Sequence, residues 1–221
     1  YRHRRIQSRA QVILRGAVDM TRGVQGRIIL DLCGGTGAWS KPYVEAGYDV
    51  RVITLPVYDV RLCRVGKEKI HGVLAAPPCT MFAISGARWK RTDEQLREAL
   101  SVVDACFRII QACKLAWWAL ENPVGKLVYY IGKWRYTFQP WEYGDPWTKR
   151  TCIWGEHNIP VKSPVAPLGQ WMGRSDKKGI VDHLEYLPAA RLPRLPPGPD
   201  RALLRSLTPP GFAKAFYEAN P

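Results

Sequence analysis

Residues 27–37 limit the possible folds more narrowly than any other stretch of the chain. They begin with an apolar run typical of a buried strand and end in a turn rich in glycine, Cys33-Gly34-Gly35-Thr36-Gly37. Residues 38–46 then predict a helix that stops at Gly47, and residues 49–54 predict a second strand. This strand-turn-helix-strand order predicts an α/β fold of the Rossmann-like kind.

The glycine-rich turn has two readings. Glycine lets the backbone come close to a ligand at the carboxyl edge of the first strand, where open α/β sheets bind cofactors. The spacing is not that of the dinucleotide motif G-x-G-x-x-G, and no Gly-Lys-Ser/Thr follows to hold phosphates. Because tight turns also follow strands where no ligand binds, this turn by itself favours an adenosyl cofactor only slightly.

Composition narrows the class of protein. The chain has 221 residues and is 46% hydrophobic, enough for one α/β domain with a small appendage. No window has the eighteen apolar residues of a membrane span, and no apolar segment follows the basic start, so we expect a soluble intracellular protein. The net charge of +14, with nine Trp and ten Tyr, is compatible with two interpretations. The protein could bind nucleic acid, or it could be a soluble basic protein without such a partner.

The six cysteines stand apart, without C-x-x-C spacing. We expect reduced thiols, most of them in the core. The four histidines are also far apart in sequence, so no metal site is expected.

A third strand is predicted over residues 72–76, and it leads into Pro77-Pro78-Cys79. The two prolines stiffen the loop and remove two backbone donors. Parallel strands end at one sheet edge, so Cys79 should share a crevice with the glycine-rich turn. A single cysteine is more often a small buried apolar residue than a nucleophile, and position alone raises the second possibility.

A fourth strand, residues 116–120, delivers Glu121-Asn122-Pro123 to the same edge. Glu121 could equally cap a helix that begins near Val124. The preceding segment predicts a helix with a capping box at Thr92 and an apolar stripe for the core.

The remaining segments predict an extension and an appendage. Residues 136–140 and 151–155 are candidate antiparallel strands. Residues 156–203 are rich in proline and form a loop-rich lobe, whose alternative reading is a disordered insertion. A short helix over 211–219 should pack on the main domain.

In this order the motifs resemble those of the DNA (cytosine-5) methyltransferases, especially the short phage-encoded members. Residues 31–37 are similar to the family's cofactor motif, Pro77-Pro78-Cys79 to its nucleophile motif, and Glu121-Asn122-Pro123 to E-N-V. Lys149-Arg150 is similar to the end of Q-x-R-x-R, and residues 205–209 to R-x-L-T. The resemblance covers roughly residues 27–210.

The resemblance implies an S-adenosylmethionine-dependent methyltransferase fold, a mostly parallel sheet with helices on both faces. It assigns residues 1–155 and 204–221 to the catalytic domain and 156–203 to a small, loop-rich target-recognition lobe. Cys79 would add to carbon 6 of a flipped-out cytosine while a carboxyl group, Glu121, assists at N3. Arg150 would hold the ring oxygen O2, and Asn122 would brace the loop.

The resemblance implies two further sets of residues, one that binds the cofactor and one that binds DNA. The cofactor leaves the reaction as S-adenosylhomocysteine. The residues expected at the cofactor are Asp31, Cys33, Gly34, Gly35, Thr36, Gly37, Trp39, Thr54, Leu55, Asp59 and Pro77. Those expected at DNA are Ser85, Arg88, Lys90, Arg91, Lys149, Arg174, Lys177 and Lys178. The resemblance also implies double-stranded DNA as partner, a monomer without metal, and the cytoplasm of a phage-infected or lysogenic bacterium.

The sequence departs from the family at three places. The second strand ends in Thr54-Leu55-Pro56 without the acid that grips the cofactor ribose, and the nearest acid is Asp59. Thr148 replaces the first arginine of Q-x-R-x-R, and the recognition lobe is short. Two alternatives therefore stay open: a DNA-binding relative that has lost turnover, and an enzyme that acts on RNA or uses a modified adenosyl cofactor.

Overall fold

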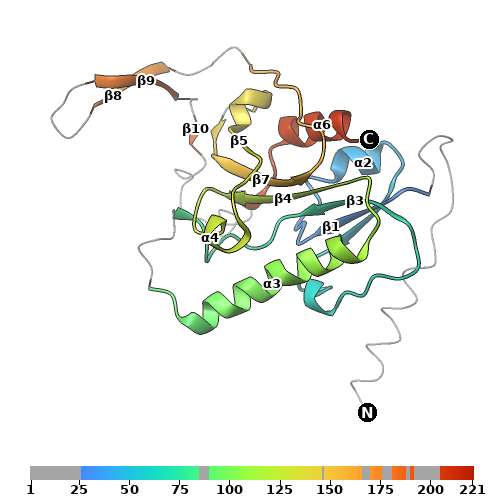
Figure 1. The fold of residues 1–221 in the computed structure, drawn as a ribbon. Helices are drawn as coiled ribbons and strands as arrows, with labels where there is room; N and C mark the ends of the chain where they lie inside the picture. The colour runs from blue at the N-terminus through green and yellow to red at the C-terminus, as the bar shows by residue number, and fades with distance from the viewer. Residues whose placement is uncertain are drawn as a thin grey trace.

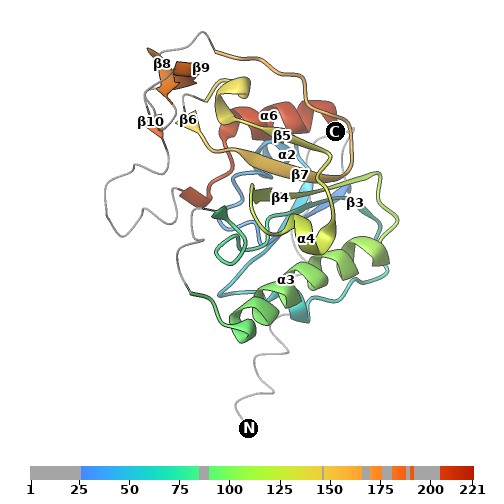
Figure 2. The same ribbon diagram turned by 60° about the vertical axis from the view of Figure 1, so that its left-hand side comes forward.

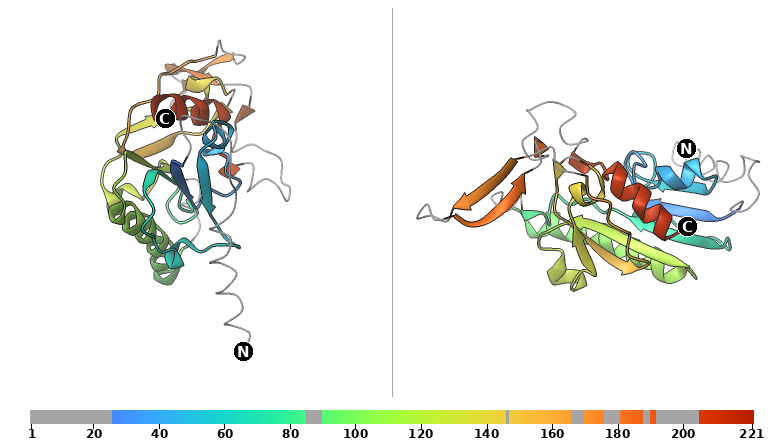
Figure 3. Two further views of the ribbon diagram at one scale, coloured as in Figure 1. Left: turned by 90° about the vertical axis from the view of Figure 1, so that its right-hand side faces the viewer. Right: turned by 90° about the horizontal axis from the view of Figure 1, so that it is seen from above.

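A computed structural model describes most of the chain, and Figures 1–3 show its ribbon. The described residues are 26–84, 90–145, 147–165, 170–175, 181–187, 190–191 and 205–221.

One mixed sheet lies at the centre of an α/β fold. In spatial order its six strands are β2 (Asp49–Ile53), β1 (Ile28–Leu32), β3 (Ile70–Ala75), β4 (Trp117–Pro123), β7 (Thr151–Glu156) and β5 (Tyr136–Phe138). The first four are parallel, and β7 runs antiparallel to β4 and β5. The mostly parallel sheet and the antiparallel extension are therefore as predicted.

The chain reverses its direction of travel across the sheet at β1. It passes from β1 to β2 on one side and then returns to place β3 on the other side of β1. This order, β2-β1-β3-β4, is that of doubly wound α/β sheets whose ligands bind beyond the carboxyl ends of the strands, at the reversal point. The loops after β1 and β3 therefore occupy the favoured place for a ligand.

Helices cover both faces of the sheet (Figures 1 and 3). On one face lies α3 (Asp93–Ala112), which starts at Thr92 with the predicted capping box, closed by Gln95. It packs on Leu30 and Val73, among other strand residues. The opposite face carries α2 (Lys41–Glu45) and α6 (Pro210–Ala219).

The core beneath α6 is built largely from aromatic rings. Phe212 stacks on Phe138 of β5 with ring centroids 3.7 Å apart, and Phe216 contacts Trp39 and Trp117 edge-on. Such rings bury large apolar areas, which explains how a ten-residue helix is held firmly. The predicted C-terminal helix is thus confirmed as part of the main body.

Several expected boundaries differ in the structure. The helix expected over 38–46 is only the five residues of α2, since residues 34–40 stay in turns. β4 continues through Pro123, because Glu121 and Asn122 pair with β7. The helix expected near Val124 starts at α4 (Val128–Ile131).

The six cysteines are unpaired thiols, as predicted, but only Cys106 and Cys152 are buried. The expectation that most are core residues holds in part, because Cys33, Cys63 and Cys113 are partly buried and pack against the core that contains Cys106 and Cys152. In the described part of the chain, no helix is long and apolar enough to cross a membrane.

Short elements form the appendage and its base. A hairpin of β8 (Gln170–Ser175) and β9 (Val181–Leu187) projects from the body (Figure 3). β10 (Ala190–Arg191) pairs in parallel with β6 (Trp147–Thr148) and so ties this segment to the residues just before β7. The two remaining elements are the 3-10 helices η2 (Val60–Leu62) and η4 (Pro140–Tyr143). The proline-rich composition of residues 156–203 gives no sign of the hairpin.

Candidate active site

The carboxyl ends of β1, β2 and β3 are joined by backbone hydrogen bonds. The amide of Cys33 donates to the carbonyl oxygen of Ile53 at 2.7 Å, and the amide of Ala76 donates to that of Leu32 at 2.9 Å. The glycine-rich turn, the loop after β2 and the loop that carries Cys79 therefore leave the sheet side by side.

The glycine-rich turn needs glycine at defined positions. Gly35 and Gly37 have φ angles of +57° and +73°, in the left-handed region that side chains disfavour. At Gly34 an added Cβ would lie 2.3 Å from the carboxyl group of Asp31, so no side chain fits. Above Gly35 there is open space, with no atom within 4 Å of the position of a Cβ.

Cys33 also has a positive φ, +59°, although it is not glycine. Its side chain points toward α3, where the thiol of Cys106 donates a hydrogen bond to it; this lowers the pKa of Cys33 and raises that of Cys106. Within the predicted cofactor set, Cys33 therefore offers its backbone rather than its sulfur.

Asp31 lies fully buried beneath the turn. Its Oδ2 accepts a hydrogen bond of 2.6 Å from the Ser40 hydroxyl, and its Oδ1 has no partner in the described part of the chain. Burial raises the pKa of Asp31 to about 6, against a smaller lowering by Ser40. An unpaired buried acceptor is costly, and a cationic or hydrogen-bonding ligand above the turn would complete its bonding.

The loop after β3 holds Cys79 in a tight turn. The carbonyl oxygen of Cys79 accepts from the amides of Phe82 and Ala83 at 2.9 and 2.8 Å. The carbonyl oxygen of Phe82 accepts in turn from the amide of Lys126 at 2.7 Å. The side-chain amide of Asn122 donates to the carbonyl oxygen of Pro77 at 2.9 Å, so both ends of the turn are tied to the segment at the end of β4.

Cys79, Glu121 and Lys149 come together at this edge. Glu121 is 8% exposed, and its Oε1 lies 3.8 Å from the ammonium nitrogen of Lys149. Burial and, next, the charge of Glu121 raise the pKa of Cys79, whereas Lys149 and Arg205 oppose that rise. The site therefore holds a thiol, a carboxylate and two cations, from four separate parts of the chain.

Two acceptor atoms of this site have no hydrogen-bond partner. They are Oε1 of Glu121 and Oδ1 of Asn122, both buried, and the statement covers the described residues only. Most buried polar atoms in proteins are satisfied, so such a pair is typical of a place where a ligand supplies the missing donors.

Arg150 is more exposed than its neighbour Lys149. Its side chain is exposed, it is not among the groups that shift the pKa of Cys79, and it lowers the pKa of Cys152 instead. Its carbonyl oxygen accepts from the amide of Val124 at 3.3 Å. The neighbouring Lys149, which the sequence grouped with DNA contacts, faces Glu121.

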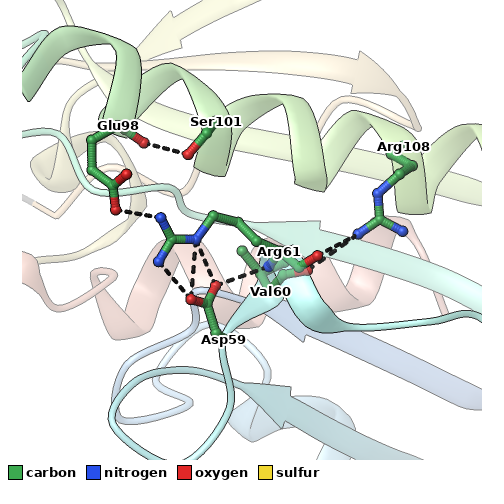
Figure 4. Close-up of polar contacts among 6 residues, drawn as sticks. All are labelled: Asp59, Val60, Arg61, Glu98, Ser101 and Arg108. Atoms are coloured by element: carbon green, nitrogen blue, oxygen red, sulfur yellow. Dashed lines mark hydrogen bonds and ion pairs between the residues drawn. The ribbon is translucent and has the colours of Figure 1, made fainter. Parts of the chain in front are cut away.

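The loop after β2 is fixed to α3 by ion pairs (Figure 4). Asp59 caps η2 by accepting from the amide of Arg61 at 2.9 Å, and both of its oxygens pair with the Arg61 guanidinium, which lowers the pKa of Asp59. Arg61 also contacts Glu98 of α3, and Arg108 donates to the carbonyl oxygens of residues 60, 61 and 63. Asp59 is thus engaged within the protein.

The other predicted cofactor residues lie around the turn. Leu55 is 64% exposed, and the carbonyl oxygen of Thr54 accepts from the amide of Tyr58 at 2.9 Å. Trp39 is buried against Phe212 and Phe216, in the core and not at the surface of the turn.

The predicted DNA contacts are only partly described. Lys90 is exposed, and Arg91 donates to the carbonyl oxygens of Met81 and Ala83, which supports the loop after Cys79. Only the backbone of Arg174 is described, within β8. Ser85, Arg88, Lys177 and Lys178 lie outside the described residues.

Sequence reasoning left two residues out of the site. Ser40 holds Asp31, and Arg205 acts on the Cys79 thiol. Arg205 could have been found from the sequence, because it begins the segment that is similar to R-x-L-T. No sequence pattern marks Ser40, which lies nine residues after Asp31.

Comparisons with known proteins give limited information. No family model and no curated protein sequence matches the chain. Among solved structures it is similar to a candidate DNA modification methyltransferase encoded within an E. coli prophage, with 14% sequence identity and a TM-score of 0.44. The match covers 67% of this chain, which spans 58% of the length of that protein. At this level of similarity an activity is not specified.

Proposed function

We propose that the protein is a DNA (cytosine-5) methyltransferase that uses S-adenosylmethionine. The observation that carries the proposal is the meeting of the Cys79 thiol with the buried carboxylate of Glu121, whose Oε1 has no hydrogen-bond partner among the described residues. A purely structural site has no need of a thiol beside an unsatisfied carboxylate.

The chemistry requires these groups together. Carbon 5 of cytosine is too poor a nucleophile to accept a methyl group directly, so the Cys79 sulfur first bonds to carbon 6. Glu121, as a carboxylic acid, gives a proton or a hydrogen bond to N3 and so removes the charge that builds on the ring. Asn122 holds the loop through Pro77, and its unpartnered Oδ1 can accept from the cytosine amino group.

The turn after β1 fits the cofactor. Open space above Gly35 allows close approach of a ligand to the backbone, and the unpartnered Oδ1 of Asp31 suits a donor or cation. S-adenosylmethionine supplies the methyl group when it is bound there. Because Asp59 is engaged by Arg61, we assign the adenosine end to the backbone and apolar atoms of residues 54–58 rather than to that carboxylate.

Target recognition is assigned to residues 156–203. β10 pairs with β6, so this segment joins the body two residues before Arg150 and close to Lys149. A target base must leave the duplex to reach Cys79, and a lobe anchored there lies beside the place that the base would enter. With so few residues we expect a short recognition sequence.

A DNA-binding relative without turnover is the second candidate. It is favoured by the engaged state of Asp59, the acid nearest to the end of β2, because both of its oxygens pair with Arg61.

Transfer of labelled methyl groups to DNA distinguishes these candidates. We expect incorporation of label from S-adenosylmethionine into double-stranded DNA at carbon 5 of cytosine, found by digestion to nucleosides. Binding of DNA without incorporation would favour the inactive relative. Incorporation into RNA alone would keep the chemistry and replace the substrate.

A further inference from the structure

Lys149 differs from other lysines of the structure in its burial. Its side chain is 14% exposed, whereas those of Lys41, Lys162 and Lys214 are 53–74% exposed. Its backbone amide donates to the side chain of Gln139 at 3.0 Å, which fixes the point at which the chain enters the site. Burying an ammonium group is costly unless it is paired, so a specific partner is expected.

The partner is Glu121, and the contact is an ion pair rather than a hydrogen bond. The ammonium nitrogen lies 3.8 Å from Oε1, which has no hydrogen-bond partner within the described chain. Lys149 therefore supplies charge to the site and leaves the Glu121 oxygen available to a ligand. A lysine placed to contact phosphate would instead extend its ammonium group into solvent.

Among the described residues, three charged groups act on the pKa of Cys79. They are Glu121 at the end of β4, Lys149 before β7 and Arg205 in the turn before α6. An ionised Cys79 beside an ionised Glu121 would place two negative charges in a half-buried space, which is unfavourable. A nearby cation offsets one of them.

We propose that Lys149 is a positioning residue that allows the Cys79 thiolate to form beside Glu121, an inference that rests on the proposed function. Two cations, Lys149 and Arg205, act on Cys79, and Lys149 is the one at ion-pair distance from Glu121. In the addition step the sulfur loses its proton and the carboxylate gains one. This arrangement, thiolate with carboxylic acid, is the one that addition to carbon 6 and protonation of N3 require.

The proton balance is simple. The S–H bond of Cys79 breaks, and an O–H bond forms on Glu121, either directly or through solvent. When sulfur bonds to carbon 6, the proton of Glu121 passes to N3 and the carboxylate is restored, so the net charge of the site is the same before and after the addition. Arg150, which is exposed, does not enter this balance.

Alkylation of Cys79 tests the inference without cofactor or DNA. The rate of modification by iodoacetamide is followed at several pH values by mass spectrometry of the Cys79 peptide. In Lys149→Met we expect the midpoint of the pH profile to rise and the rate at pH 8 to fall about tenfold, the effect of removing one nearby opposite charge. Lys149→Arg should stay near wild type, and so should Lys133→Met, which removes an exposed lysine. An unchanged midpoint in folded Lys149→Met overturns the inference.

A second pair of variants covers the case in which Lys149→Met does not fold. Removal of both partners avoids an unpaired buried charge. We expect the midpoint of Glu121→Gln to be lower than that of wild type, and that of the double variant Glu121→Gln with Lys149→Met to be higher than that of Glu121→Gln. Equal midpoints in these two variants overturn the inference.

Trapping on DNA that contains 5-fluorocytosine separates this inference from the proposed function. If Lys149→Met loses trapping but keeps the wild-type alkylation profile, Lys149 contacts DNA and the inference is wrong while the proposed function stands. If the wild type itself forms no adduct, the proposed function fails. The alkylation profiles still decide whether Lys149 acts on Cys79.

Discussion

The loop after β2 and the segments that carry Cys79, Glu121 and Asn122 lie at one edge of the same sheet, yet their polar groups are satisfied to different extents. Both oxygens of Asp59 are engaged by Arg61, which also reaches Glu98 of α3 (Figure 4). Oε1 of Glu121 and Oδ1 of Asn122 are buried and, among the described residues, unpartnered.

An unsatisfied buried acceptor costs about 1–3 kcal/mol, so a protein keeps one only where something else benefits. We infer from the comparison that the β2 loop is scaffold, and we propose that the segments around Cys79 bind a ligand. Substitutions in the first should therefore change mainly stability, and substitutions in the second should change activity as well.

Gly34→Ala is expected to have the largest effect, because it damages scaffold and ligand site together. The new Cβ would lie 2.3 Å from the buried Asp31 carboxyl group, which Ser40 holds in place. We expect loss of measurable S-adenosylhomocysteine binding by calorimetry and a free energy of unfolding lower by about 1–3 kcal/mol. Gly66→Ala, where nothing lies closer than 4.0 Å, is the control. Wild-type affinity in Gly34→Ala would mean that the cofactor binds elsewhere.

Glu121→Gln should lower both activity and stability. Loss of the acid is expected to slow methyl transfer by about 10²–10⁴-fold, the usual contribution of a general acid. The free energy of unfolding should also fall, by about 3–5 kcal/mol at most, because the buried ammonium group of Lys149, 3.8 Å from Oε1, loses its ion-pair partner. Glu156→Gln, on the exposed end of β7, serves as the matched variant. Rates are compared under conditions in which both variants are folded. Equal rates in the two variants would remove Glu121 from the mechanism.

Asp31 gives the site a pH dependence of predictable sign. Its pKa of about 6 in the folded protein lies above the ordinary value, so the folded state binds more protons than the unfolded state between about pH 4 and 6. Stability should therefore fall as the pH rises through that range, by about 3 kcal/mol at most, and Asp31→Asn should flatten this slope. Urea unfolding at a series of pH values measures it, and a slope of equal size in the variant would contradict the burial effect.

Cofactor affinity should change in the opposite direction over the same range. S-adenosylmethionine carries a positive charge, so its binding should tighten as Asp31 ionises near pH 6. The product S-adenosylhomocysteine lacks the sulfonium charge and serves for comparison.

Asp59→Asn should have the smallest effect, and mainly on stability. The pair with Arg61 is partly exposed, with side-chain exposures of 20% and 32%, so we expect a loss below about 1 kcal/mol. The pKa of Asp59 is lowered, hence its stabilisation is present above the ordinary carboxyl pKa near 4 and is lost as the pH falls through the lower folded value. Chemical unfolding at pH 7 and pH 3 checks the sign; a larger loss at pH 3 would contradict it.

The sheet and its order of motifs could be predicted because they depend on local signals. Apolar runs that end in Gly34-Gly35, Pro77-Pro78 or Glu121-Asn122 locate the strands and their carboxyl ends, and Thr92 with Gln95 marks the start of α3. Parallel order then brings those ends together.

The details that could not be predicted depend on contacts between distant segments. Five residues suffice for α2 because Tyr43 is fully buried, and β4 extends through Pro123 because β7 pairs with it. Either Lys149 or Arg150 could have faced Glu121. The structure has Lys149 there, because its side chain points toward Glu121 just before β7 begins. Neighbouring basic residues look alike in sequence.

Covalent trapping measures the central claim most directly. The protein is incubated with S-adenosylmethionine and double-stranded DNA in which 5-fluorocytosine replaces cytosine, and adducts are resolved under denaturing conditions. We predict a stable adduct in the wild type whose DNA is attached to the peptide that carries Cys79, and none in Cys79→Ser, with equal thermal stability of the two proteins. Absence of an adduct in a wild type that binds this DNA, or attachment at another residue, would contradict the account.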